Sequence, residues 1–114
     1  MPQLITSGSE LIRINLAKNS IERSTNGGVS WTPRYSGTSA GTFRDLLIYG
    51  TELLACTSKG IYYSTNGGIS WIPRCTTAPA GDFLTIATDG SRLLATTASH
   101  LYTSNNKGVS WVRR

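Results

Sequence analysis

The sequence predicts an all-β fold built from three four-stranded repeats, and three observations carry this prediction. A box of eight residues recurs at 24–31, 64–71 and 104–111, and it reads STNGGVSW, STNGGISW and SNNKGVSW. Segments such as LLIYG, LLACTS and IYYST are rich in β-branched and aromatic residues and are bounded by Gly, Asn and Ser. No segment of helical length places apolar residues on one helical face.

The repeat extends beyond the boxes on both sides. The motifs GSEL, GTEL and GSRL precede the three boxes, at residues 8–11, 50–53 and 90–93. In the second unit we expect strands at 43–49, 52–58, 61–65 and 69–74. In the third unit we expect them at 83–88, 92–98, 100–104 and 108–113. The first unit, at 3–34, has two extra residues, which we expect in the loop around Lys18 and Asn19.

Four short strands in a repeat of about 40 residues are the period of a propeller blade. The 114 residues are expected to form a single domain. The blades are expected at about 1–36, 41–76 and 81–114. The fold class that we predict is therefore an all-β propeller segment of three four-stranded blades.

Each box is expected to form a tight hairpin. In the first box, Asn26 and Gly27 favour a turn that needs positive φ, and the Asn26 side chain can hold the turn by bonding backbone amides. The three tryptophans of the sequence all stand at the last position of a box. A large apolar side chain in the same place of every unit indicates a structural role.

The boxes resemble the Asp-box, or BNR repeat, whose pattern is S-x-D-x-G-x-x-W. The matching residues are Ser24, Asn26, Gly28, Trp31, Ser64, Asn66, Gly68, Trp71, Ser104, Asn106, Gly108 and Trp111. Asparagine replaces aspartate in all three boxes, and its side-chain oxygen can still accept the turn hydrogen bonds. The resemblance implies a β-propeller but no single function, because sialidases, sortilin-type receptors and photosystem assembly factors share the repeat.

Three blades do not close a ring, because propellers typically have four to eight. An open stack would leave two bare blade faces, which are mostly apolar and prone to aggregation. Copies of this chain supply blades in threes, and six is the only multiple within the usual range. We therefore expect a head-to-tail homodimer that forms a six-bladed ring. The alternative is that the chain is a fragment of a longer propeller.

Little in the sequence supports catalysis or a metal site. His100 is the only histidine, and the two cysteines, Cys56 and Cys75, lack the repeated spacing of a disulfide framework or zinc site. A sialidase would carry an arginine triad, a Tyr–Glu pair and an F/Y-R-I-P motif, and that motif is absent. We expect a protein that is not an enzyme and has no cofactor, with a sialidase-like glycoside hydrolase as the least favoured interpretation.

Two groups of residues are candidates for ligand binding. Arg34, Arg74 and Arg114 follow the tryptophan of each box by three residues and could form a charged rim. The simpler interpretation, which we favour, is that each outer strand ends in a solvated arginine. The second group consists of positions that vary between the units, at Thr6, Arg13, Arg44, Asp45, Tyr49, Asp89 and Arg92. The tyrosines Tyr35, Tyr62, Tyr63 and Tyr102 could stack on sugars or pack between blades.

The most favoured function is a binding or scaffolding propeller with a protein partner, and the alternative is a lectin-like propeller with a glycan ligand. The net charge of +5 is spread along the chain, without the aromatic–basic pattern of a nucleic-acid-binding module. No amphipathic helix or long apolar run suggests a membrane partner, and the N-terminus lacks the order of a signal peptide. Unless an export signal has been removed, we expect a cytoplasmic location.

Overall fold

The computed structural model describes residues 4–7, 10–36, 40–76 and 80–114. Within these ranges the chain forms three four-stranded antiparallel sheets, which we call blades 1, 2 and 3. Blade 1 consists of β1 (Leu4–Ser7), β2 (Glu10–Asn15), β3 (Ser20–Ser24) and β4 (Thr32–Ser36). Blade 2 consists of β5 (Phe43–Tyr49), β6 (Glu52–Thr57), β7 (Gly60–Ser64) and β8 (Ile72–Cys75). Blade 3 consists of β9 (Thr85–Thr88), β10 (Leu93–Thr96), β11 (Leu101–Ser104) and β12 (Val112–Arg113).

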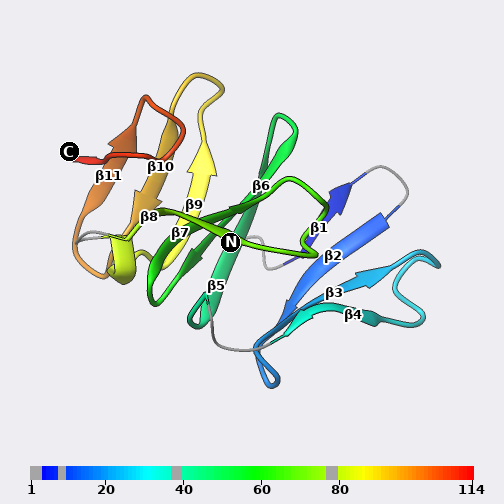
Figure 1. Ribbon diagram of the computed structural model, residues 1–114. Helices are drawn as coiled ribbons and strands as arrows, with labels where there is room; N and C mark the ends of the chain where they lie inside the picture. The colour runs from blue at the N-terminus through cyan, green and yellow to red at the C-terminus, as the bar shows by residue number, and fades with distance from the viewer. Residues whose placement is uncertain (1–3, 8–9, 37–39, 77–79) are drawn as a thin grey trace.

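Each blade is a simple meander, in which strands that are consecutive in the sequence are paired. The first strands of the blades contact each other in chain order, β1 with β5 and β5 with β9. Figure 1 shows the three sheets side by side, with blade 1 at one end, blade 2 in the middle and blade 3 at the other. The predicted all-β architecture of three four-stranded units is confirmed.

In the second and third units the strand boundaries differ from the expected ones mainly at the last strand. The strands β8 and β12 begin at Ile72 and Val112, three and four residues later than expected, because the box turn uses every residue up to the tryptophan. In blade 3, β9 begins at Thr85 because a short 3₁₀ turn, η1 (Ala80–Asp82), precedes it. The two extra residues of the first unit lie between Asn15 and Ser20, as predicted.

The box turn is held by its serine and asparagine side chains. In blade 1, the Ser24 Oγ accepts hydrogen bonds from the Gly28 amide (2.9 Å) and the Asn26 amide (3.3 Å). The same hydroxyl donates to Asn26 Oδ1 (2.8 Å), which also accepts from the Ser30 amide (3.0 Å). The Asn26 Nδ2 donates to Ser30 Oγ at 2.8 Å. Asparagine therefore keeps the acceptor role and adds a donor that a carboxylate would lack.

The backbone of the box turn passes through the left-handed region. Gly27 and Gly28 have φ values of 74° and 93°, as the Asn-Gly sequence predicts. The third box has Lys107 where the other two have glycine, and this residue takes a φ of 65°. A side chain in this conformation is strained, since its Cβ lies close to the following carbonyl oxygen. The third box is therefore the least relaxed of the three.

Two apolar clusters fill the spaces between the blades. The first joins Ile12, Ile14 and Ile21 of blade 1 to a larger group in blade 2, namely Phe43, Leu46, Leu53, Ala55, Tyr62 and Trp71. The second joins Leu54, Cys56, Ile61 and Cys75 of blade 2 to the corresponding group in blade 3, namely Phe83, Ile86, Leu93, Ala95, Tyr102 and Trp111. Because each cluster is shared by two sheets, the blades stabilise one another rather than folding around separate cores.

The aromatic rings pack within these clusters. Tyr35 meets Phe43 edge-on at 5.7 Å between ring centroids, and Tyr102 lies 5.4 Å from Phe83. Trp71 also donates from Nε1 to the Gly68 carbonyl at 3.1 Å. Cys56 and Cys75 are both buried and form no disulfide with each other. In the described part of the chain, no helix has the length and apolar character needed to cross a membrane.

Candidate functional site

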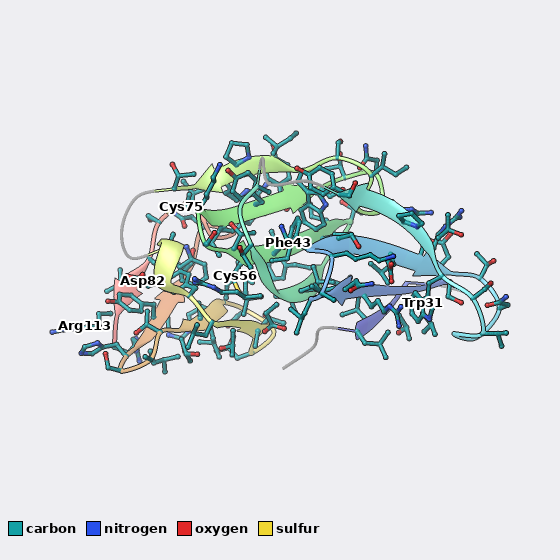
Figure 2. All side chains as sticks on the ribbon, turned by 90° about the horizontal axis from the view of Figure 1, so that it is seen from below. Trp31, Phe43, Cys56, Cys75, Asp82 and Arg113 are labelled. Atoms are coloured by element: carbon teal, nitrogen blue, oxygen red, sulfur yellow. The ribbon has the colours of Figure 1, made fainter. Side chains whose placement is uncertain are left out.

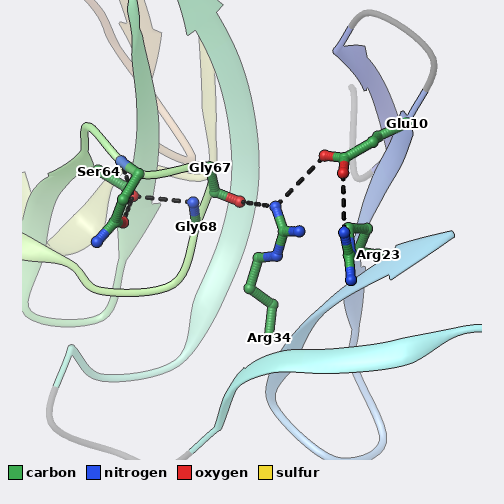
Figure 3. A network of polar contacts seen from close by, with 7 residues as sticks. Glu10, Arg23, Arg34, Ser64, Gly67 and Gly68 are labelled. Carbon is green, nitrogen blue, oxygen red and sulfur yellow. Dashed lines mark hydrogen bonds and ion pairs between the residues drawn. The ribbon is translucent and has the colours of Figure 1, made fainter. Parts of the chain in front are cut away.

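The first two arginines of the predicted rim join neighbouring blades. Arg34 donates from Nη1 to the carbonyl of Gly67 in the next blade at 3.0 Å and lies 3.4 Å from Glu10 (Figure 3). The same glutamate accepts a hydrogen bond from Arg23 at 3.0 Å. The Arg34 side chain is only 12% exposed. A ligand at this position would therefore have to compete with contacts that hold blade 1 to blade 2.

Arg74 makes the same connection between blades 2 and 3, with more partners. It donates to the Lys107 carbonyl at 3.1 Å and to the two Glu52 carboxylate oxygens at 2.7 and 2.8 Å. Its guanidinium also lies over the Tyr63 ring, 3.9 Å from the centroid. The hydrogen bond from Arg74, together with its charge, lowers the pKa of Glu52. The carboxylate is thus held in its charged form.

Arg114, the third arginine, is exposed on blade 3, where its amide donates to the Leu101 carbonyl at 2.8 Å. The position that holds Glu10 and Glu52 in the other blades is occupied here by Arg92, which pairs with Asp89 at 3.3 Å. Arg92 and Arg114 both line a cavity of about 210 Å³. The third arginine therefore has a basic neighbour where the first two have an acidic one.

Arg44 and Asp45 connect blade 2 to the beginning of blade 3. Arg44 donates from Nη1 to the Gly81 and Phe83 carbonyls at 2.8 and 3.2 Å. Asp45 is completely buried, and its carboxylate accepts from the Leu46 amide at 3.1 Å and the Ile86 amide at 2.9 Å. Burial raises the pKa of Asp45 despite these two hydrogen bonds. These two candidates are neighbours in sequence but face different environments.

Cys56 lies close enough to Asp45 to be affected by its charge. Burial and the Asp45 carboxylate raise the pKa of the Cys56 thiol to about 12. At neutral pH the thiol is therefore protonated, and a protonated, buried thiol is a poor nucleophile. Among the described residues, no group of three or more His, Cys, Asp or Glu side chains is placed to hold a metal ion.

Two adjoining cavities form a groove near the starts of β5 and β9. The cavities measure about 520 and 400 Å³ and share Arg44, Leu84, Thr97 and Ala98. The larger cavity is also lined by Leu16 from the β2–β3 loop of blade 1. Leu16 and Leu84 are 60% and 42% exposed. We call this feature the Arg44 groove, and the volume of each of its two cavities lies in the range of ligand-binding sites.

The Arg44 groove combines three kinds of contact. Leu16, Leu84 and Ala98 offer apolar surface, Thr97 offers a hydroxyl, and Arg44, which lines both cavities, supplies a positive charge. Of these residues, only Arg44 is a candidate from the sequence. The two leucines lie outside the strands. Leu16 is an apolar residue in a connection, and Leu84 follows Phe83 within the strand expected at 83–88, so neither residue indicated a site. Their meeting depends on how blades 1 and 3 approach blade 2.

No protein-family model matches the sequence, and no curated protein is detectably similar to it. Several solved structures are similar in fold. An ancestral GH74 enzyme superposes with a TM-score of 0.72 at 17% identity, covering 96% of this chain and 17% of the enzyme. YCF48 from Cyanidioschyzon merolae superposes with a TM-score of 0.69 at 19% identity, covering 97% of this chain and 42% of YCF48. A structure of YCF48 bound to D1 peptide gives 0.70 at 20% identity, covering 94% and 38%.

These structures are β-propellers, and the similarity extends over nearly all of this chain. The chain spans less than half the length of each of them. At identities of 17–20% the likeness concerns the fold and not the function. The three sheets described above are therefore blades of a β-propeller.

Proposed function

We propose that this protein is a non-catalytic propeller that binds another protein through the Arg44 groove. The observation that carries the proposal is that two adjoining cavities share Arg44 and exposed Leu84, and that exposed Leu16 lines the larger of them. An extended polypeptide offers apolar side chains, which can pack on the two leucines, and carboxylates, which the positive charge of Arg44 attracts while its guanidinium also holds the Gly81 and Phe83 carbonyls.

The states of the carboxylates support a role without catalysis. Glycoside hydrolysis uses two carboxyl groups, and the one that acts as acid needs a raised pKa and access to substrate. Hydrogen bonds from arginines hold the pKa values of Glu10 and Glu52 below their usual range. Burial alone would raise the pKa of Glu22, but Arg13 and Asn15 donate to it and keep it lowered. Asp45 has a raised pKa but is completely buried.

The comparisons add a second line of support. One of the structurally similar proteins, YCF48, has been solved bound to D1 peptide, so a propeller of similar shape has a peptide ligand. The alternative of a glycan ligand has less support, because the tyrosines that could stack on sugars are engaged. Tyr62 is 8% exposed, Tyr63 lies under Arg74, and Tyr102 packs on Phe83.

The proposed binding protein is completed by self-association. Three blades are fewer than the four to eight of typical closed propellers, and a head-to-tail homodimer would supply six. Its mass would be twice the 12.3 kDa of the chain. The measurement is absolute mass by light scattering behind a sizing column, and a monomer at micromolar concentration would argue against this part of the proposal.

The binding function is tested with a library of random 12-residue peptides displayed on phage. We expect the library to yield peptides that bind the wild-type protein and lose at least tenfold in affinity against Leu84→Glu, which places a charge in the groove. Val29→Glu is the matched control, because Val29 is 85% exposed in the first box and lies outside the groove. It should bind like the wild type.

Three outcomes would count against the proposed function. Selected peptides that bind Leu84→Glu as well as wild type would show that the groove is not the site. Failure to select any peptide would argue against a linear protein ligand. Binding on a glycan array that survives in Val29→Glu but not in Leu84→Glu would favour the carbohydrate alternative, at the same groove.

A further inference from the structure

The two internal junctions between blades are formed by equivalent contacts. The face that a blade turns to the following blade is called its forward face, and the opposite one its rear face. On the forward faces, Ile21 and Ile61 pack against the box glycines Gly68 and Gly108 of the next blade, where an added Cβ would lie 3.2 and 3.6 Å from their methyl groups. Nearby, Arg34 and Arg74 donate to box carbonyls of the next blade.

The same elements stand on the two outer faces of the molecule. Leu101 occupies the place of Ile21 and Ile61 on the forward face of blade 3, and Arg114 occupies the place of Arg34 and Arg74. On the rear face of blade 1, Gly27 and Gly28 occupy the places that Gly67 and Gly68 have in blade 2. At that internal junction the first glycine accepts the arginine hydrogen bond and the second contacts the isoleucine. Figure 2 shows Trp31 and Arg113 at opposite ends of the row of blades, which places these two faces far apart within one chain.

Exposure shows that both outer faces lack the cover that the inner ones have. Ile21 and Ile61 are completely buried, whereas Leu101 is 41% exposed. On the rear faces, Leu46 and Ile86 are completely buried, whereas Leu4 at the same register position is 54% exposed. Apolar side chains thus lie uncovered at the very positions that are buried in the internal junctions.

The rear face of blade 1 also carries charges that the internal rear faces lack. Arg13 and Glu22 replace the paired residues Ala55 and Tyr62 of blade 2, and the two charged groups are 2.8 Å apart. The guanidinium of Arg13 lies 4.1 Å from the centroid of Trp31, and Glu22 is only 6% exposed. This face is therefore bulkier and more polar than its internal counterparts.

The forward face of blade 3 changes in the complementary direction. Thr96 stands where blades 1 and 2 have Ile14 and Cys56, and Thr103 stands where blade 2 has Tyr63. Ala87 replaces Leu47 on β9. The face is thus smaller and richer in hydroxyl groups, which suits a partner with large polar side chains.

We propose that the forward face of blade 3 docks on the rear face of blade 1 of a second copy of this chain. Leu101 then packs on Gly28 of the second copy, and Arg114 donates to its Gly27 carbonyl. Thr96 and Thr103 lie opposite the Arg13–Glu22 pair. This inference rests on the proposed self-association and specifies its junction.

Charge disfavours a pairing of two forward faces, because it would gather Arg92 and Arg114 from both chains. On the rear face Arg13 is paired with Glu22 at 2.8 Å, so this face does not repel a basic forward face as a second forward face would. A head-to-tail contact also uses both outer faces of each chain. A ring of two copies therefore has two identical junctions and leaves no blade face uncovered.

The experiment uses one variant for each face and measures absolute mass by light scattering. Leu101→Glu blocks the forward face and Leu4→Glu blocks the rear face, each with a charge at an already exposed position. We expect both to be monomers at a concentration where the wild type is a dimer. A mixture of the two variants should form a dimer, because one chain keeps an intact rear face and the other an intact forward face.

Ile72→Glu is the control, since Ile72 is 46% exposed on β8 of the middle blade, and this variant should remain a dimer. Circular dichroism checks that every variant is folded, and Ala87→Glu repeats the forward-face test if Leu101→Glu is not. A monomeric wild type would overturn both the junction and the self-association, leaving peptide binding untouched. A dimeric Leu101→Glu, or variants that stay monomeric when mixed, would overturn the junction alone.

Discussion

Replacing Arg74 by alanine should destabilise the protein more than any other change to a surface arginine. The change removes the hydrogen bond to the Lys107 carbonyl, the bidentate contact with Glu52 and the stacking on Tyr63. A charge-assisted hydrogen bond contributes about 1.5–3 kcal/mol, and a partly exposed ion pair adds up to about 1 kcal/mol. Because the Arg74 side chain is 12% exposed, we expect a net loss of about 2–3 kcal/mol.

Arg34→Ala is the matched comparison, since Arg34 makes the same interblade bond with fewer supporting contacts. It donates to the Gly67 carbonyl at 3.0 Å, but its single contact with Glu10 is 3.4 Å long. We expect a loss of about 1–1.5 kcal/mol. Arg113→Ala serves as the control: Arg113 is exposed, and its contact with His100 is 3.4 Å long, so the change should stay within about 0.5 kcal/mol.

The assay is urea unfolding followed by tryptophan fluorescence, with all variants at one protein concentration. The order Arg74→Ala, then Arg34→Ala, then Arg113→Ala is the expected ranking of destabilisation. If Arg74→Ala differs from wild type by less than about 0.5 kcal/mol, the interblade contact contributes nothing and the reasoning is refuted. If Arg34→Ala loses more stability than Arg74→Ala, the inference that Glu52 strengthens the Arg74 contact is wrong.

The pH dependence gives an independent check of the same contact. The hydrogen bond from Arg74 lowers the folded-state pKa of Glu52 below its ordinary value of 4.5. Its contribution is therefore present above the unfolded-state pKa and is lost as the pH falls through the folded-state pKa. The stabilities of wild type and Arg74→Ala should approach each other as the pH is lowered below 4.5.

Three further predictions concern single positions. Lys107→Gly should stabilise the protein by about 0.5–1 kcal/mol in urea unfolding, because Lys107 has a φ of 65°, which glycine adopts without strain; a loss of stability would contradict this. Burial raises the folded-state pKa of Asp45 above 3.8, so the wild type should lose stability relative to Asp45→Asn as the pH rises through the interval above 3.8. If the stabilities of the two proteins change in parallel with pH, the raised pKa of Asp45 is disproved. Gly60→Ala should lower the free energy of unfolding by about 3 kcal/mol or more in thermal unfolding, because the added Cβ would clash with the Cys75 carbonyl. Gly50 also has positive φ but open space around it, so Gly50→Ala should lower this free energy by only about 1 kcal/mol.

Much of the fold was predictable because its signals are local. The boxes predict turns at the right places, since the φ values of Gly27 and Gly28 and the bonds of Asn26 depend on residues next to each other in the chain. The late start of β8 was not predicted, because the apolar Ile69 suggests a strand from which the box turn excludes it. The alternation of apolar and polar residues indicates a strand, but it does not indicate at which residue the pairing with the neighbouring strand begins.

The candidate site was less predictable than the fold. Arg44 stood out as a residue that varies between units, and in the structure it lines both cavities of the groove. The interblade contacts of Arg34 and Arg74 were not anticipated, because each joins a residue to a carbonyl 33 positions away. The roles of Leu16 and Leu84 likewise depend on three blades meeting.

The three repeats, their turns and the order of the strands can be inferred from the sequence alone, because hydrogen bonds within a box and pairing between consecutive strands are short-range interactions. Which face of each blade is covered depends on how the blades pack together. Burial of Leu46 and Ile86 and exposure of Leu4 follow from the presence or absence of a neighbouring sheet, although the three residues occupy the same register position. Apolar residues at equivalent positions of the three blades cannot be told apart by sequence, because their burial depends on contacts between blades and not on the local pattern.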